Sequence, residues 1–403
     1  MTGAGERGME TGEWRFWMNN HEAVLGVTVV LLLVGTLNIF SSSFVVASSN
    51  YDDPYFFLRK QGINVAVGLV CFAIGCIDYH YLVKGRIAGF FLVLALLGAV
   101  AAAGVEVNGA RRWLSLGGFQ LQPAELAKPA AIFLEAYYIA WRVQHGMRCK
   151  FFHNEIYMIG AMGLLVELEP DMGTAMIICG VPLFMLICSN MHNSTKIKLF
   201  LSVIAGAAAL CTLQPYRLQR IRALFDPWTD AQGTGYQIVQ SLQAIGSGGL
   251  TGMGIGMGVS KYHYLPEAHT DFAFSVWCQE MGFLGAFFVL LMFALLAYYG
   301  VRIANNAKDA LGQMLAFGAT MLIVGQAVIN LLMISGCLPV VGVPLPFISY
   351  GGTSLFVSLF MIGVLFNVGL RNAQKPETPK PKAAAPRVAG PKYVGRPKLR
   401  RVK

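Results

Sequence analysis

The segment LPEAHTD, residues 265–271, ends in the carboxylate best placed to do chemistry. It contains Glu267, His269 and Asp271, and it leads from a long polar stretch into an apolar one. Asp271 could cap the helix that follows, because aspartate favours N-cap positions. A carboxylate held beside a bound substrate could instead act as a general base toward a hydroxyl. The residues alone leave both roles open, with Glu267 and His269 as candidate supporting groups.

Charged residues between 111 and 128 indicate a second element of the chemistry. Glu125 and Lys128 are three residues apart, so they share one face of a helix inside an apolar segment. Ionisable groups within a membrane are costly and often mark functional sites. With Arg111 and Arg112 just before them, they predict an anion site for a phosphate or pyrophosphate headgroup, with Arg112 the weaker candidate. The alternatives are a structural Glu125–Lys128 ion pair and a loop that contacts anionic lipid.

The remaining charges of the same polar segments are interpreted more simply. The three arginines at 217, 220 and 222 are predicted to form a solvated face. Lys261 stays open between a surface cation and a substrate contact. Asp171 is a predicted helix cap, because Asp favours that position. Glu280, two turns into an apolar segment, is expected to make a buried polar contact.

Composition excludes a soluble enzyme and excludes disorder over most of the length. Apolar residues make up 55% of the 403 and charged residues 13%, against about 25% in an ordinary soluble domain. A membrane-spanning helix needs about 20 mostly apolar residues. The predicted fold class is therefore an all-α polytopic membrane protein with about ten transmembrane helices, the fifth being short: 22–44, 62–80, 86–104, 123–141, 155–169, 172–190, 197–214, 272–300, 313–336 and 350–370.

The distribution of charge orients these segments. The formal net charge of +10 belongs to residues 371–403, which hold 11 Lys or Arg and one acid, while residues 1–370 are neutral. Lys and Arg favour cytoplasmic loops, and with both termini inside, 22 cations lie inside and eight outside. The chain is thus divided into a cytoplasmic segment 1–21, a membrane domain 22–371 and a basic, disordered cytoplasmic tail 372–403.

Three predicted outer segments are unusual enough to carry function. Residues 105–122 are polar and amphipathic, 215–271 form a long outer loop between helices 7 and 8, and 337–349 contain three prolines that prevent a continuous helix. The glycine-rich run 246–258 is interpreted as a flexible outer loop or re-entrant turn, since it opens no βαβ unit that would bind a nucleotide. Histidines and cysteines show no zinc-ligand spacing, so no dedicated metal site is predicted.

Four blocks, in order along the chain, resemble one known family. They are NGARRWLSLGGFQLQPAELAK (108–128), LEPDMGTA (168–175), QSLQAIGSGGLTGMGIGMGVSKYHYLPEAHTDFAF (240–274) and GVPLPFISYGGTSL (342–355). The chain resembles the SEDS family, the FtsW, RodA and SpoVE proteins of bacterial cell division, elongation and sporulation, from about residue 22 to 371. The early stretches SSSFVVASS and DDPYFFLRKQ are closer to the division members.

The resemblance implies a peptidoglycan glycosyltransferase that polymerises lipid II, the undecaprenyl-pyrophosphate-linked disaccharide peptide, at the outer face of the bacterial cytoplasmic membrane. It also implies a class B penicillin-binding protein transpeptidase and other divisome membrane proteins as partners, and no nucleic acid. The essential aspartate of the family's TDF motif matches Asp271, which favours catalysis over capping. The G-A-R-R-W and E-L-x-K blocks match Arg111, Trp113, Glu125 and Lys128.

The mechanism implied by the resemblance is an inverting transfer with Asp271 as base. Arg111 and Lys128 would stabilise the departing pyrophosphate, and a divalent cation could assist. Gln279 and Ala124 depart from the pattern of many relatives, which have an acid and a serine there. Two other functions remain open, a lipid II flippase and a non-catalytic divisome scaffold.

Overall fold

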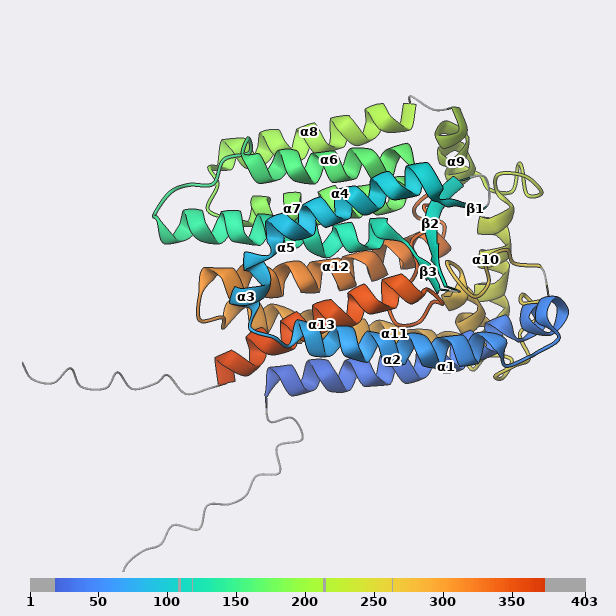
Figure 1. The fold of residues 1–403 in the computed structure, drawn as a ribbon. Coiled ribbons are helices and arrows are strands. Elements are labelled where there is room, and N and C mark those ends of the chain that lie inside the picture. The colour runs from blue at the N-terminus through green and yellow to red at the C-terminus, as the bar shows by residue number, and fades with distance from the viewer. Residues whose placement is uncertain (1–18, 108–109, 118, 213–214, 263, 374–403) are drawn as a thin grey trace, which may run out of the picture. The chain divides into compact units, whose positions relative to one another are not determined.

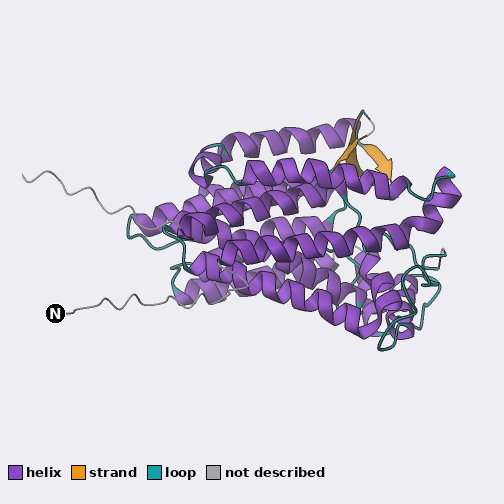
Figure 2. Cartoon of the chain, turned by 90° about the horizontal axis from the view of Figure 1, so that it is seen from below, coloured by secondary structure: helices purple, strands orange, loops and turns teal. Residues whose placement is uncertain are grey.

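The computed structural model describes residues 19–107, 110–117, 119–212, 215–262 and 264–373. This part of the chain is mostly helical (Figure 2). Most of the predicted cytoplasmic segment and nearly all of the predicted tail lie outside the described residues. The ten predicted segments coincide with ten long helices: α1 (Asn20–Tyr51), α2 (Phe56–Gly75), α4 (Arg86–Ala103), α5 (Pro123–Gln144), α6 (Asn154–Leu168), α7 (Met172–Cys188), α8 (Asn193–Thr212), α11 (Ala273–Asn305), α12 (Ala310–Ile334) and α13 (Gly352–Ala373).

Shorter elements occupy the connections. They are the helices α3 (Tyr79–Lys84), α9 (Pro215–Phe225) and α10 (Tyr236–Ser247), and the strands β1 (Val105–Val107), β2 (Ala110–Leu116) and β3 (Phe119–Leu121). The three strands pair antiparallel in chain order, with Glu106 opposite Arg111 and Ser115 opposite Gln120. The 105–122 segment, predicted only as polar and amphipathic, is thus a small sheet, and 215–271 contains two helices. Figure 1 places the strands, α9 and α10 at the same end of the bundle.

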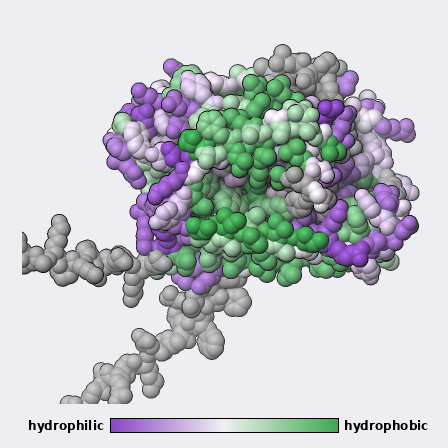
Figure 3. Space-filling view, viewed as in Figure 1, coloured by the Kyte–Doolittle hydropathy of each residue, from purple (hydrophilic) through white to green (hydrophobic). Residues whose placement is uncertain are grey.

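The length and apolar character of the helices make this a multi-pass membrane protein. Six helices in the described part of the chain are long and apolar enough to cross a membrane, namely α1, α2, α4, α11, α12 and α13. The helix α7 is apolar but shorter, and α5 contains ionisable side chains along its length. An apolar band crosses the middle of the molecule between hydrophilic ends (Figure 3). The predicted fold class is confirmed.

The helix α13 forms the interior of the bundle. In its most apolar stretch 78% of the residues are buried, against 22% for α2 and for α4, which therefore lie at the outside of the bundle. α13 packs against α1, α2, α5, α11 and α12. Because α5 and α12 are themselves largely buried, polar side chains on these helices face protein rather than lipid.

The glycine-rich run 246–258 packs against α11, which favours the re-entrant turn over the flexible outer loop among the two interpretations of it. α11 breaks at Gly282, whose φ of 63° is in the left-handed region, and residues 249–254 fill the break. The amides of Met253 and Gly254 donate to the carbonyls of Gln279 and Glu280 at 3.1 and 2.9 Å. The amide of Phe283 in turn donates to Gly249 at 2.9 Å. These bonds replace the helical ones that the break removes, as a membrane interior requires.

Candidate active site

Asp271 lies in a tight turn immediately before α11. The amides of Thr270 and Phe272 both donate to the carbonyl of Glu267, at 3.1 and 3.2 Å, which closes the turn. The N-cap of α11 is Phe272, and no side chain caps this helix end. The capping role considered for Asp271 is therefore wrong, and its carboxylate does not bond to the backbone amides of α11.

The Asp271 backbone and carboxylate have different surroundings. Asn330 of α12 donates one amide group to the carbonyls of Asp271 and Val343, at 2.8 and 2.7 Å, and so ties the turn to the proline-rich loop. One carboxylate oxygen faces Gly342 of that loop, 3.5 Å from where a Cβ would stand. Among the described residues none donates a hydrogen bond to this carboxylate. An ionised carboxylate without donors is a good proton acceptor.

The electrostatic surroundings of Asp271 favour its use as a base near neutral pH. Burial and the nearby carboxylates of Glu267 and Asp171 raise its pKa to about 7, while the charges of Arg112 and Arg220 oppose that rise. A general base works best when its pKa lies near the operating pH. The same two arginines give the site positive charge for an anionic leaving group.

A second acidic group borders the site at the end of α6. Asp171 caps α7 by accepting from the amide of Thr174 at 3.2 Å, as predicted, and its other oxygen accepts from Gln122 at 3.1 Å. Glu169 is buried, and neither of its carboxylate oxygens has a hydrogen-bond partner in the described part of the chain. Burial and Asp171 raise the pKa of Glu169 to about 7.

The strand β2 separates the two predicted arginines. Arg112 turns toward the site and donates to the carbonyls of Glu169, at 3.1 Å, and Pro170. Arg111 is largely exposed and lies 3.7 Å from Glu106 on the neighbouring strand. Trp113 is half-buried on the same strand and pairs with Val105. Because side chains alternate along a strand, only one of two adjacent arginines can face Asp171 and Asp271, and it is Arg112 rather than the favoured Arg111.

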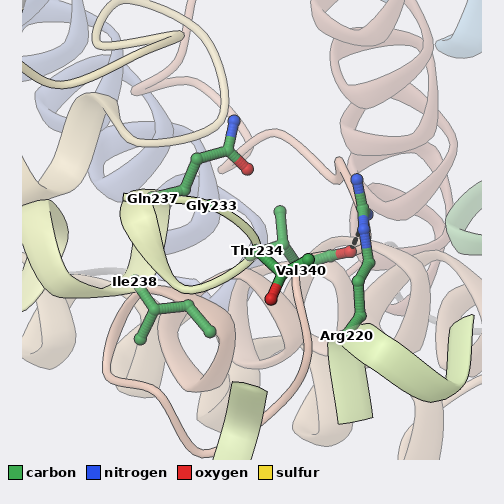
Figure 4. Close-up of a pocket in the computed structure, with 6 residues that line it drawn as sticks. All are labelled: Arg220, Gly233, Thr234, Gln237, Ile238 and Val340. Carbon is green, nitrogen blue, oxygen red and sulfur yellow. Dashed lines mark hydrogen bonds between the residues drawn. The ribbon is translucent and has the colours of Figure 1, made fainter. Parts of the chain in front are cut away.

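Arg220 also belongs to this site, so its predicted place on a solvated face was wrong. Its guanidinium donates to the carbonyl of Val340 in the proline-rich loop, and together with Thr234, Gln237 and Ile238 it lines a cavity of about 160 Å³ (Figure 4). The cavity thus lies where α9, α10 and the proline-rich loop meet. The side chains of Arg217 and Arg222 lie outside the described part of the structure.

His269 and Glu267 are both close to Asp271 but have different surroundings. The His269 ring packs against Phe57 and Tyr350, with ring centroids 4.9 and 6.0 Å away. Burial lowers its pKa, so the ring is neutral at pH 7. Glu267 is exposed, with φ of 53°, and accepts from the Thr270 hydroxyl at 2.8 Å. Both residues shape the turn that holds Asp271.

Lys128 and Glu125 form a buried ion pair. The ammonium of Lys128 is 2.6 Å from Glu125 and also donates to Gln326 of α12 at 3.1 Å. Gln326 donates in turn to the Pro344 carbonyl at 3.0 Å, so the pair connects to the loop beside Asp271. Glu135, further along α5, lies outside this network and contacts His153 at 3.1 Å. Glu125 therefore forms the ion pair with Lys128 that was predicted as the alternative to an anion site.

Lys261 lies in a separate buried network at the break in α11. Its ammonium donates to Glu280 at 2.8 Å, to Ser41 of α1 at 3.1 Å and to the Gly256 carbonyl at 2.6 Å. Glu280 makes the buried polar contact expected of it. The structure therefore does not bring Lys261 to the turn that holds Asp271.

Two amide side chains that position the site were missed from the sequence. Gln326 and Asn330 lie four residues apart in the apolar helix α12, and therefore on one face of it. That spacing was the available signal, because polar residues in a membrane helix usually have a partner. No group of three or more His, Cys, Asp or Glu side chains in the described ranges is arranged to hold a metal ion.

The fold and this site define a polytopic membrane protein with a carboxylate-centred site at one end of its bundle. The chain belongs to the cell cycle protein family of FtsW, RodA and SpoVE, whose match covers residues 22–374. The predicted resemblance is confirmed.

Relatives and solved structures agree with this assignment. The chain is 37% identical over 355 residues to a probable peptidoglycan glycosyltransferase FtsW of Geobacter sp. (strain M18), covering 86% of this chain and 96% of that one. It is 36% identical over 348 residues to stage V sporulation protein E of Bacillus subtilis (strain 168), covering 85% and 94%.

Solved structures resemble this fold as well. A chain from a study of the structural coordination of polymerization and crosslinking by a peptidoglycan synthase complex matches with a TM-score of 0.70 and 25% identity, over 89% of this chain and 100% of that one. The rod shape determining protein RodA of Thermus thermophilus matches with a TM-score of 0.62 and 24% identity, over 87% and 97%. The RodA match carries the fold alone.

Proposed function

We propose that this protein is a peptidoglycan glycosyltransferase that polymerises lipid II into glycan strands during cell division or septum synthesis. The observation that carries the proposal is the Asp271 carboxylate, which has no donor among the described residues, has a pKa of about 7, and lies beside Arg112 and Arg220. The names of the relatives, peptidoglycan glycosyltransferase FtsW among them, support this activity. The similar synthase complex coordinates polymerization with crosslinking, which supports a crosslinking partner here, and we propose that this partner is a class B penicillin-binding protein.

The proposed reaction follows from the placement of these charges. Asp271 removes the proton from the sugar hydroxyl of the acceptor lipid II, and the oxygen attacks the anomeric carbon of the growing strand with inversion. Undecaprenyl pyrophosphate leaves as its bond to that carbon breaks. Arg112 and Arg220 stabilise the charge that develops on it. Arg111 and Trp113 on β2 are proposed to contact the headgroup from the rim, and Lys128 to contribute through Gln326 and the Pro344 carbonyl.

The site also suggests how the protein lies in the membrane. We propose that the end holding Asp271 faces outward from the cytoplasmic membrane and that both termini are cytoplasmic, in line with the excess of Lys and Arg at the opposite end. Other divisome membrane proteins are further proposed partners. Cysteine accessibility in intact cells, with labels at Phe152 and at Tyr262, would report the two exposed ends separately.

Polymerisation of purified lipid II is the direct test. The full-length protein with its penicillin-binding partner is expected to produce glycan strands visible on a gel, and the partner alone should produce none. A flippase would instead move labelled lipid II across sealed vesicles without polymerising it. A scaffold would neither polymerise lipid II nor move it across the vesicle membrane. Movement without polymerisation, or no activity at all, would contradict the glycosyltransferase assignment.

The rate of polymerisation is expected to depend on pH through the ionisation of Asp271. The base must be deprotonated, so the rate should fall about tenfold per unit below pH 7 and level off above it, because the pKa of Asp271 is raised to about 7. Replacing Glu267 with glutamine removes one carboxylate that raises this pKa, so the midpoint should move to lower pH. A profile that is flat between pH 5 and 8, at constant partner binding, would contradict the role of Asp271.

A further inference from the structure

A second cavity, of about 450 Å³, lies at the end of the bundle opposite Asp271. It is formed between the last turns of α5 and the first turn of α6. Four aromatic side chains line it, together with one cation and one carboxylate: Tyr137, Tyr138, Trp141, Phe152, Arg142 and Glu155. The proposed transfer reaction uses none of these residues.

Arg142 has too few acceptors for its donors. Its Nε is buried and has no hydrogen-bond partner in the described part of the chain. A terminal nitrogen reaches only the Met147 sulfur, at 3.8 Å, and a thioether is a weak acceptor. The guanidinium lies 5.4 and 5.8 Å from the rings of Tyr138 and Trp141. Buried charged donors are normally bonded, so an anionic oxygen in the cavity would complete this site.

A second arginine stands behind the wall of the cavity. The Arg86 guanidinium lies over the ring of Tyr137, 3.4 Å from its centroid, and its Nε is also buried and without a partner among the described residues. Tyr137 therefore has the Arg86 guanidinium over its ring, and it lines the cavity together with Arg142. The charge of Arg86 behind this wall adds to that of Arg142, which lines the cavity, and together they favour an anion over a neutral ligand.

The surroundings of the cavity indicate the depth of lipid headgroups. Trp141 is 39% exposed, Phe152 70% and Tyr157 61%. Exposed Trp and Tyr at the ends of membrane helices typically lie at the level of the headgroups. The cavity is at the end of α5 and the start of α6, where the apolar band gives way to hydrophilic surface, as also seen at both sides of Figure 3.

We propose that this cavity binds the headgroup of a membrane phospholipid, with its phosphate on Arg142. Glu155 in the same cavity provides a partner for an ammonium group, and the aromatic walls favour a cation as well. The geometry therefore points to an aminophospholipid of the phosphatidylethanolamine type. The back of the site is fixed by His153, which stacks on Tyr138 with 3.6 Å between ring centroids and binds Glu135 at 3.1 Å.

Native mass spectrometry of the full-length protein tests this proposal. In detergent with added phosphatidylethanolamine, we expect one tightly retained lipid. Replacing Arg142 with glutamine should weaken binding about tenfold, since a charge-assisted hydrogen bond contributes that much. Replacing Glu155 with glutamine should remove the preference for phosphatidylethanolamine over phosphatidylglycerol. The matched control is Arg148→Gln, an exposed arginine near the same end that lines no part of the cavity.

Two further arms keep the outcome decisive. Inorganic phosphate should not displace the lipid at millimolar concentration, and full displacement would show a site for a free anion instead. If Arg142→Gln does not fold, Phe152→Ala removes an exposed wall of the same cavity and should weaken retention without affecting folding. Equal lipid retention by Arg142→Gln, Phe152→Ala and the unaltered protein would overturn the proposal. Polymerisation of lipid II is read separately and does not decide this result.

Discussion

Replacing Asp271 with asparagine is expected to lower the rate of glycan-strand formation by at least about 100-fold, the usual contribution of a general base. Asparagine keeps the size of the side chain but cannot accept the proton. The carboxylate makes no hydrogen bond to a described residue, so its loss leaves no donor unsatisfied. The measurement is lipid II polymerisation by the purified protein with its penicillin-binding partner, with partner binding checked in the same preparation.

The matched control for this change is Asp226→Asn. Asp226 is an exposed carboxylate between α9 and α10, bonded to the amide of Trp228 and the hydroxyl of Thr229. Asp226 is also a carboxylate, but no contact among the described residues joins it to Asp271. Polymerisation by Asp226→Asn should therefore be unchanged. Full polymerisation by Asp271→Asn would show that Asp271 is not the general base.

The Asp271 change should also affect stability in a direction that separates catalysis from misfolding. The pKa of Asp271 is raised from 3.8 to about 7, so ionising the folded protein costs more than ionising the unfolded chain. That cost is absent below pH 4 and complete above pH 7. An asparagine at this position carries no charge, so the variant should be more stable at pH 8, by about 4 kcal/mol for a shift of this size, and about equal at pH 4. An inactive but stabilised variant would locate the defect in chemistry.

Replacing Lys128 with methionine is expected to destabilise the protein by about 3–5 kcal/mol, because it leaves the buried Glu125 carboxylate without its partner. The two groups are 2.6 Å apart, and their side chains are 1% and 3% exposed. The change also removes the bond to Gln326, which holds the Pro344 carbonyl beside the active-site turn. Thermal unfolding in detergent is the measurement.

The double variant Lys128→Met with Glu125→Gln is the control for this result. It removes both charges, so most of the lost stability should return. At restored stability, the lipid II affinity of the double variant decides the proposed pyrophosphate role. A lower affinity would support that role for Lys128, whereas an unchanged affinity would leave Lys128 as a structural residue only. A single variant as stable as the unaltered protein would contradict the ion pair itself.

The helices were predictable because their signal is local. A run of about 20 apolar residues can hide its backbone polar groups only as a helix in lipid. The ten predicted segments therefore match ten helices, and the cap at Asp171 follows from one residue and its neighbours. The fifth segment is short in the structure also, at 15 residues.

The partners of the charged side chains were much less predictable. Adjacent arginines look alike in sequence, yet the strand β2 turns Arg112 toward Asp171 and Asp271 and leaves Arg111 exposed. The sequence left Lys261 open between a surface cation and a substrate contact. In the structure it lies at the break in α11 and donates to Glu280 and Ser41. Arg220 was predicted to lie on a solvated face, but it donates to the carbonyl of Val340 in the proline-rich loop. Each error concerns residues that are far apart in sequence and adjacent in space.

Contiguous residues were enough to establish the membrane fold, the family and Asp271 as the carboxylate to test. Apolar length, charge and family motifs are properties of contiguous residues, and these survive without knowledge of packing. Long-range packing was needed to show that Asp271 caps nothing and that burial, with the charges of Glu267, Asp171, Arg112 and Arg220 around it, sets its pKa near 7. Charge interactions depend on distance and burial across the whole bundle, so the site is fixed where the sheet, the long outer loop and the proline-rich loop converge.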